Sequence, residues 1–242
     1  MGTTSVDVSA RLREHYAGYG RSPSEWARVG ALAKAENLLA LARAVPHDSV
    51  LEIGCGEGSL LQRIAELGFA RELAGIDIAA PSIEAVRGRR IPGLVAEVFD
   101  GSTVPFPDRS FDLVVLSHVV EHLEHPRQLL CEAARVGRHV FVEVPLEDHW
   151  RLPRDFVFDA TGHINFFHAK SIRRLVQSCG LTVLAERVAT PAREAYAHRR
   201  GGAGIARFWV KQLLLRTAPF LATRLSTYHG ALLCRPEGGE RP

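Results

Sequence analysis

The sequence has few cysteines, little net charge and no long apolar run, and each shortage excludes a class of protein. Its 242 residues include four cysteines, which are scattered and form no C-x-x-C pair, so we expect neither a disulfide framework nor a zinc site but reduced thiols in a cytoplasmic protein. The net charge of +3 is too small to indicate a nucleic-acid partner, and we expect none. No apolar run reaches the length of a membrane span, and residues 1–10 lack a secretory signal pattern.

An apolar content of 46% in 242 residues suits one α/β domain with additions and a sizeable core. The most informative stretch is VLEIGCGEGSLL, residues 50–61. It predicts a short buried strand, a turn and a helix that begins near Ser59. The turn has three glycines, which let the backbone bend sharply and approach a ligand closely: Gly54, Gly56 and Gly58. This combination is typical of a nucleotide-type cofactor site.

The spacing of the turn favours one kind of cofactor. It reads G-x-G-x-G and follows Glu52, whereas a dinucleotide fingerprint would need a glycine in place of Ser59. The next apolar run, residues 73–78, carries Asp77 near its end. An acid there can accept hydrogen bonds from both hydroxyls of a ribose. Together these features resemble the class I S-adenosylmethionine-dependent methyltransferases.

Two downstream segments extend this resemblance. Residues 104–117, VPFPDRSFDLVVLS, resemble the LPFPDxSFDLV signature of small-molecule methyltransferases, and residues 162–167, GHINFF, resemble a GHxNFF segment of the same family. The resemblance implies a Rossmann-like, doubly wound α/β fold with a mainly parallel seven-stranded sheet, helices on both faces and an antiparallel last strand. It also implies methyl transfer from S-adenosyl-L-methionine to a small molecule, and we expect oxygen as the acceptor atom. The alternative is a non-catalytic Rossmann-like nucleotide-binding module.

The resemblance also suggests which residues hold the cofactor. An acid at the position of Asp100 contacts the adenine amino group in the family, and the residue at Ile78 packs on the adenine ring. The full set of expected cofactor-binding residues is Glu52, Gly54, Cys55, Gly56, Gly58, Asp77, Ile78, Asp100, Gly101 and Ser117.

A cluster of His118, Glu121 and His122 follows the predicted strand at residues 111–117. At spacing i, i+3, i+4 these side chains would share one helical face, and literally they match the H-x-x-E-H motif of a zinc peptidase. We disfavour a peptidase because the motif follows a buried parallel strand inside a nucleotide-binding pattern. Some related methyltransferases carry E-x-x-E-H here and bind a divalent ion, and His118 replaces the first Glu of that run.

The third interpretation is a turn that lines the site, with a histidine as the base. We expect His163 to return near the cluster, and we take His118, His122 and His163 as the candidate catalytic residues. We assign no metal. If one binds, its ligands are expected to be His118, Glu121, His122 and His163.

The flanking segments are less informative. Residues 1–45 predict a mobile lead-in over 1–20 and a cleft-covering helix over 24–44, and residues 46–188 predict the cofactor-binding core with a substrate loop at 146–168. Residues 189–225 predict a basic and apolar insertion, flexible over 190–204, and 226–242 a last strand and a tail. We expect Tyr16, Tyr19 and Trp26 to pack in the core rather than to close the cleft.

The apolar segment 205–225 has two interpretations. Its arginines do not fall on one helical face, so we favour packing in the core or as a lid over contact with a membrane or lipid substrate. The sequence does not indicate an oligomeric state.

Overall fold

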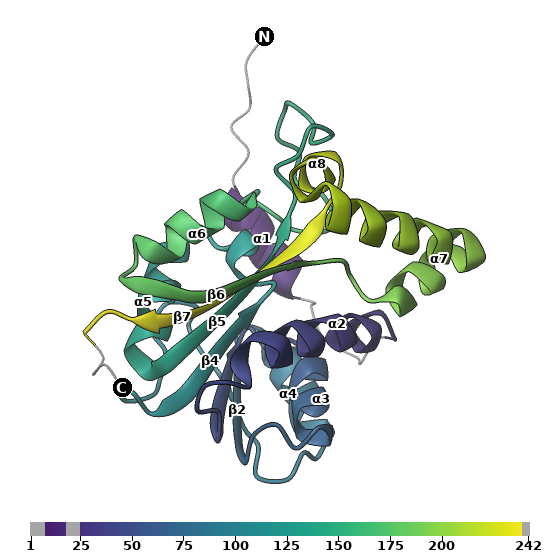
Figure 1. Cartoon of the computed structure of the whole chain (residues 1–242). Coiled ribbons are helices and arrows are strands. Elements are labelled where there is room, and N and C mark those ends of the chain that lie inside the picture. Colours follow the sequence, from purple (N-terminus) through teal and green to yellow (C-terminus); the bar gives the residue numbers. More distant parts are fainter. Residues whose placement is uncertain (1–7, 18–24, 239–242) are drawn as a thin grey trace.

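The structure, a computed structural model, describes residues 8–17 and 25–238. Its centre is a seven-stranded sheet in the order β3-β2-β1-β4-β5-β7-β6, with helices on both faces (Figure 1). All neighbouring strands are parallel except the two pairs that include β7. The predicted fold class is therefore confirmed. The strands span Ser49–Ile53 (β1), Glu72–Asp77 (β2), Val95–Val98 (β3), Phe111–Ser117 (β4), Gly137–Leu146 (β5), Leu181–Ala189 (β6) and Tyr228–Pro236 (β7).

The helices cover the sheet because each buries one apolar stripe. Helices α2, α3 and α4 pack on one face and α5 and α6 on the other (Figure 1), which gives two separate core clusters. Both faces of the sheet are therefore covered by helices. Because the side chains on both faces of a central strand such as β4, FDLVVLS, are buried, its sequence is almost continuously apolar. The helices span Val8–Ala17 (α1), Glu25–Ala42 (α2), Ser59–Glu66 (α3), Ala80–Gly88 (α4), Val120–His122 (η1, a 3₁₀ turn), Pro126–Val136 (α5), Ala169–Gln177 (α6), Arg193–Thr217 (α7) and Pro219–Leu225 (α8).

The last strand, β7, lies between β5 and β6 and runs against both. Its first residues therefore sit at the carboxyl ends of the parallel strands, where His229 pairs with Pro145 of β5. The start of β7, near the C-terminus of the chain, therefore lies at the same edge of the sheet as the glycine turn.

Two flanking segments that we expected to be mobile or flexible form helices, and their mobility stays a prediction. Within the lead-in that we expected to be mobile, residues 8–17 form helix α1. The expected flexible insertion instead forms the first part of α7, which is kinked at Gly201. Tyr19 lies outside the described residues. No helix in the described ranges is both long and apolar enough to cross a membrane.

The expected core or lid packing of residues 205–225 holds for one side only. Phe208 and Ala222 are buried, and residues on that side of α7 line the cleft described below. On the other side the large apolar side chains of α7 and α8 are exposed, among them Trp209, Leu213 and Phe220.

Candidate active site

A cleft of about 1200 Å³ opens at the carboxyl ends of the parallel strands. Residues of α1, α2, the glycine turn, η1, the loop at 146–168 and α7 line it. In open α/β sheets ligands bind outside these strand ends, where neighbouring loops diverge. The glycine turn, the His-Glu-His segment and the long loop, which the sequence predicted separately, therefore share one cavity.

The glycine turn is held open by left-handed backbone and by an acid of the neighbouring strand. Gly54, Gly56 and Gly58 have φ angles of +72°, +52° and +80°, which residues with a Cβ adopt only at a cost. The Oδ2 atom of Asp77 accepts a hydrogen bond from the Gly56 N–H at 2.8 Å, and its Oδ1 accepts one from the Ala79 N–H at 2.9 Å. Each oxygen keeps a second lone pair for a ribose hydroxyl.

Glu52 is the second acid of this turn, and only one of its two carboxyl oxygens, Oε2, lacks a hydrogen-bond partner. Its carboxyl group is buried. Burial raises the pKa of Glu52 to about 8, although nearby Lys34 opposes the shift. Lys34, on α2, donates from its ammonium group to the Ser117 carbonyl oxygen at 3.3 Å. A buried acid with one free oxygen and a lysine in one cleft suit the ammonium and carboxylate of a bound amino acid. Sequence reasoning missed Lys34, the lone charge in the run GALAKA.

The other end of the cleft suits a flat ring that carries a donor. The Oδ1 atom of Asp100 accepts hydrogen bonds from the N–H groups of Ser102 and Thr103, both at 2.7 Å, and these lower its pKa. Ile78 exposes 47% of its surface in the cleft. Gly101 has a φ of +83°, and a Cβ there would lie 3.2 Å from Ile78 Cγ2. An ionised acid beside an apolar surface fits the adenine assignment that the resemblance implied.

Three of the expected cofactor-binding residues, Cys55, Gly58 and Ser117, are tightly packed against their neighbours. A Cβ on Gly58 would lie 3.0 Å from Val86, and one on Gly75 would lie 3.0 Å from the sulfur of Cys55. Burial also raises the pKa of the Cys55 thiol. Ser117 donates its hydroxyl to Glu143 at 2.7 Å. Contacts of these three residues with a cofactor stay predictions.

The helical face predicted for His118, Glu121 and His122 is wrong. His118 has a left-handed φ of +59°, and only residues 120–122 that follow it form one 3₁₀ turn. His118 N–H donates to the Glu143 carbonyl oxygen at 2.8 Å, so this residue still belongs to the end of the sheet. The helix that an H-x-x-E-H peptidase needs is therefore not formed.

The structure brings Glu121, His122 and His163 together. Glu121 is fully buried, and neither of its carboxylate oxygens has a hydrogen-bond partner. His122 Nε2 lies 3.9 Å from Glu121 Oε1, and the rings of His122 and His163 are 4.8 Å apart. One ligand atom from each residue lies within 4.8 Å of the others. Burial raises the pKa of Glu121 and lowers that of His122.

Outer hydrogen bonds fix which nitrogen each ring presents. His122 Nδ1 lies 3.0 Å from the Gly162 carbonyl oxygen, and His163 Nδ1 lies 2.6 Å from Glu147 Oε2. Both partners are acceptors, so in the neutral form of each ring Nδ1 carries the proton and Nε2 keeps its lone pair. Burial lowers the pKa of His163, but the hydrogen bond and charge of Glu147 outweigh it and raise the pKa.

The GHINFF segment reaches η1 through backbone hydrogen bonds. The N–H groups of Ile164 and Asn165 both donate to the Glu121 carbonyl oxygen at 2.9 Å. The Asn165 side chain donates to the Leu123 carbonyl oxygen at 2.7 Å. The loop thus wraps around the 3₁₀ turn, which places His163 beside His122.

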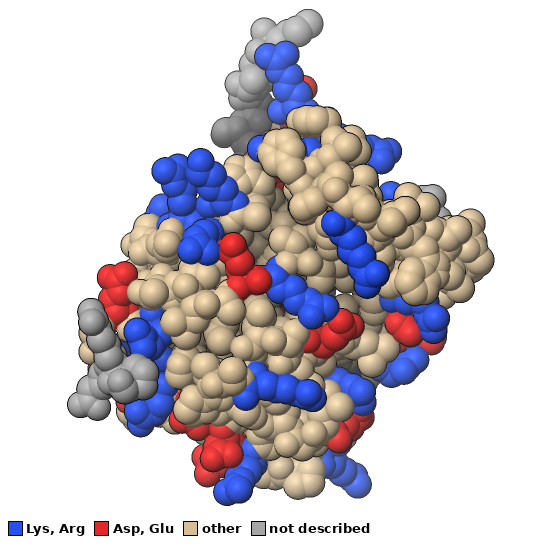
Figure 2. Space-filling view, in the orientation of Figure 1, with Lys and Arg blue, Asp and Glu red and all other residues tan. Residues whose placement is uncertain are grey.

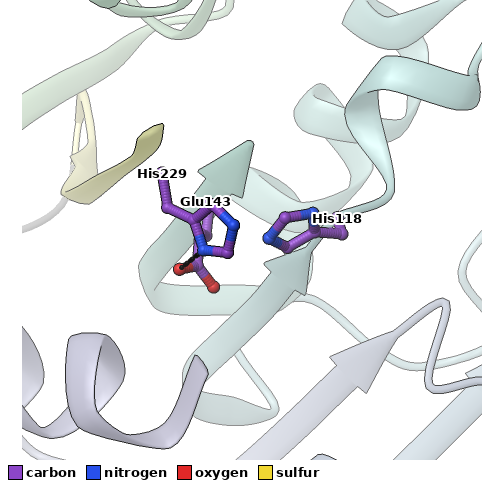
Figure 3. Close-up of side chains that lie close together, drawn as sticks. All are labelled: His118, Glu143 and His229. Atoms are coloured by element: carbon purple, nitrogen blue, oxygen red, sulfur yellow. Dashed lines mark ion pairs between the residues drawn. The ribbon is translucent and has the colours of Figure 1, made fainter. Parts of the chain in front are cut away.

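A second cluster joins His118, Glu143 and His229 from three different strand ends (Figure 3). Glu143 is fully buried and accepts hydrogen bonds from Asn37 Nδ2 and the Ser117 hydroxyl, both at 2.7 Å. His229 Nδ1 lies 3.4 Å from Glu143 Oε1, an ion-pair distance without the alignment of a hydrogen bond. The rings of His118 and His229 are 4.5 Å apart.

This second cluster contains a stable carboxylate. Burial alone would raise the pKa of Glu143, but His229, His118 and the Ser117 hydroxyl lower it to about 2. Burial lowers the pKa of His118 well below its ordinary value, and its Nε2 has no hydrogen-bond partner. The sequence carried one signal for this cluster, because Glu143 is the lone acid in the apolar run VFVEVPL. Nothing in the sequence tied His229 to it.

Two aromatic residues that we expected in the core line the cleft instead. Tyr16 of α1 meets the His122 ring edge-on at 5.9 Å, and Trp26 of α2 is 43% exposed. A Cβ on Gly162 would lie 3.1 Å from the ring of His15, so α1 packs against the loop. Helix α1 therefore covers the Glu121–His122–His163 cluster.

Comparisons with known proteins agree with this geometry. A family model described as "Methyltransferase domain" matches residues 25–186. The aklanonic acid methyltransferase of Streptomyces sp. (strain C5) is 36% identical over 129 residues, which cover 50% of this chain and 59% of that protein. The mitochondrial ubiquinone biosynthesis O-methyltransferase of Candida albicans is 29% identical over 93 residues, or 36% of this chain and 28% of that protein.

A solved structure shows the same fold over nearly the whole chain. The geranyl diphosphate C-methyltransferase of Streptomyces coelicolor A3(2), in complex with Mg²⁺, geranyl diphosphate and S-adenosyl-L-homocysteine, aligns with a TM-score of 0.63 at 14% identity. The alignment covers 97% of this chain and 100% of that one. By sequence, the chain spans less than two thirds of the length of these curated relatives.

Proposed function

Because the chain belongs to the class I S-adenosylmethionine-dependent methyltransferases, we propose that it methylates an oxygen atom of a small molecule bound between η1 and α7. Its enzyme class and cofactor follow from the family. The acceptor and the acceptor atom are the proposal. The observation that carries it is the buried Glu121 carboxylate, which makes no hydrogen bond and lies beside His163. Its Oε1 lies 3.3 Å from His118 Nδ1 and 3.9 Å from His122 Nε2.

The cofactor side of the cleft fits S-adenosyl-L-methionine, which supplies an electrophilic methyl group when bound. Asp77 would accept the ribose hydroxyls, and Asp100 with Ile78 would receive the adenine ring. Glu52 and Lys34 would take the ammonium and carboxylate of the methionine portion. The partnerless Oε2 of Glu52 supports this fit, because a buried acid is stabilised by a cationic ligand.

The acceptor side of the cleft fits a hydroxyl group that must lose its proton. Two imidazole nitrogens and a carboxylate without a hydrogen bond form a donor set that suits a divalent transition metal. A metal bound there would lower the pKa of an acceptor hydroxyl. Glu147 and the Gly162 carbonyl hold the two rings in the matching tautomer.

The relatives support a small molecule but differ in the acceptor atom. One is named as an O-methyltransferase and another as a C-methyltransferase. Oxygen is favoured here because the cluster lies in the cofactor cleft and its chemistry serves proton removal. The outer cleft is lined by Tyr196, Arg207 and Lys211 of α7, which suits an acceptor with an anionic or aromatic part.

The test is methyl transfer from a labelled donor to pools of hydroxylated small molecules. EDTA should stop turnover, and Glu121→Gln and His163→Ala should each reduce it at least 100-fold, while cofactor affinity stays unchanged. His47→Gln is the control, since His47 stacks on Phe69 outside the cleft.

Two other outcomes are distinct. If turnover survives EDTA but is lost in His163→Ala, a histidine and not a metal removes the proton of the acceptor. Full activity in both cluster variants would overturn the proposal.

A further inference from the structure

The outward face of α7 and α8 consists of large apolar side chains, and these side chains are exposed to solvent rather than packed against other described residues. Val210, Leu213 and Phe220 expose 64–70% of their surface, and Trp209 exposes 58%. Residues 205, 209 and 213 recur every four positions and so lie on one side of α7. We define the α7–α8 face as Ile205, Trp209, Val210, Leu213, Phe220 and Leu221.

In helix α7 the usual arrangement of a surface helix, with apolar side chains inward and charged side chains outward, is partly reversed. Its charged Lys211 points inward and is buried, where its ammonium group lies 4.2 Å from the Tyr228 ring and donates to the Thr227 carbonyl oxygen. Its large apolar side chains point outward. Soluble surfaces rarely leave such side chains contiguous, so a patch of this kind marks an interaction site.

A neighbouring loop extends the same face. The Trp150 N–H donates to the Arg224 carbonyl oxygen of α8 at 2.9 Å, which fixes this loop beside α8. The Trp150 side chain is 65% exposed, and Phe156 and Val157 of the same loop are also exposed. Figure 1 shows the loop next to α8, at the end of the molecule from which α7 projects.

Beyond Glu194, the charges of α7 and α8 have one sign, whereas the neighbouring loop is mixed, with exposed Arg151, Arg154 and Asp155. Between Glu194 and Glu237 the sequence has no Asp or Glu, but it has six Arg and one Lys. Arg216 of α7 is exposed and lies on the same side of the helix as Ile205 and Trp209. Figure 2 shows tan surface over α7 and α8 that is crossed by blue side chains. Tryptophans on an apolar face flanked by arginines are typical of a segment that lies in a membrane interface.

We propose that the α7–α8 face docks the protein on the surface of an anionic lipid membrane, with Trp209 and Trp150 at the level of the lipid headgroups. The apolar side chains supply the insertion, and the arginines supply attraction to anionic headgroups. A second copy of the chain is disfavoured as the occupant, because it would set two basic faces against each other. No described helix can cross a membrane, so the contact is with the surface.

This orientation has a consequence for the cleft. The opposite side of α7 lines the cleft through Tyr196, Arg207 and Lys211. A docked protein would therefore hold its cleft beside the membrane, within reach of an acceptor dissolved in lipid. This consequence, unlike the docking itself, rests on the proposed methyl transfer.

The test is co-sedimentation of the whole chain with vesicles, without cofactor or acceptor, so that its failure is distinct from a failure of methyl transfer. We expect binding to phosphatidylcholine vesicles that contain about a third phosphatidylglycerol, and weaker binding to pure phosphatidylcholine. Leu213→Ser with Phe220→Ser should weaken binding about 30-fold or more, and Arg216→Gln about fivefold. Val95→Ser, an exposed apolar position on the far edge strand β3, should change nothing.

Tryptophan fluorescence tests the orientation. The chain has three tryptophans, so Trp26→Phe with Trp150→Phe leaves Trp209 as the only reporter. Its emission should shift to the blue when anionic vesicles are added. The proposal is overturned by binding that Leu213→Ser with Phe220→Ser does not weaken, by an absence of vesicle binding, or by a dimer in sedimentation velocity that this double variant dissociates.

Discussion

Glu52 should release a proton when the cofactor binds, and this prediction tests the cofactor assignment. Burial raises the pKa of Glu52 to about 8 in the free protein, from an ordinary value of 4.5. At pH 7 about nine tenths of the molecules therefore carry a protonated Glu52. A cofactor ammonium beside the carboxyl would favour its charged form and return the pKa towards its ordinary value.

The size of the effect follows from linkage. If the pKa falls from about 8 to 4.5, cofactor affinity should rise about 25-fold between pH 5.5 and 7. Over this interval the cofactor's own α-amino group stays protonated, since its ordinary pKa lies near 8. The sign is fixed: a raised pKa in the free protein makes binding stronger as pH increases.

Isothermal titration calorimetry in buffers of different ionisation enthalpy measures the released protons directly. We expect about 0.9 proton per cofactor at pH 7 for the natural chain and close to none for Glu52→Gln. The variant should also lose most of the pH dependence, because neutral glutamine cannot titrate. Equal proton release by both proteins would refute the assignment of Glu52 to the cofactor ammonium.

Three further predictions concern the site and its support. Asp77→Ala should weaken cofactor binding by about 2–3 kcal/mol in calorimetry, with a smaller loss for Asp77→Asn; unchanged affinity would exclude its contact with the ribose. Gly54→Ala should lower the free energy of unfolding in urea by about 2–4 kcal/mol, because its Cβ would lie 2.5 Å from Val119 Cγ2. Gly68→Ala, also at positive φ but with nothing within 4 Å, should cost only about 1–2 kcal/mol, and equal losses would rule out the clash. The pKa of Glu143 is lowered to about 2, so its stabilisation is present above pH 4.5 and is lost as the pH falls. The natural chain should therefore lose about 2 kcal/mol more than Glu143→Gln between pH 6 and 3, and parallel curves would contradict the ionised carboxylate.

The fold could be predicted because its signals are local. The run VLEIGCGEG predicts a strand and a turn within nine residues. Strand β4 is predicted by its continuous apolar sequence, which follows the VPFPDRS segment at residues 104–110. The position of Asp77 at the end of the next strand then completes a pattern that depends on spacing along the chain. Such patterns survive in a single sequence.

The missed parts depend on contacts between distant segments. Glu143 and His229 are 86 positions apart and meet only because β7 enters the sheet beside β5. His118 was assigned to a helix from its spacing, but its hydrogen bond to the Glu143 backbone keeps it in the sheet. The outward apolar face of α7 was assigned to packing because periodicity shows where apolar side chains gather but not which side of the helix meets the protein.

The insertion of β7 between β5 and β6 sets an order for synthesis of the protein on the ribosome. Strand β6 ends at Ala189, yet its partner in the sheet begins at Tyr228. At about 5–20 residues per second, β6 waits roughly 2–8 s for that partner to be translated. During this interval β5 and β6 have open edges, and His229 is missing from the cleft. A nascent chain should therefore complete its cleft only in the last step of folding, and a chaperone that shields strand edges would act on it in this interval.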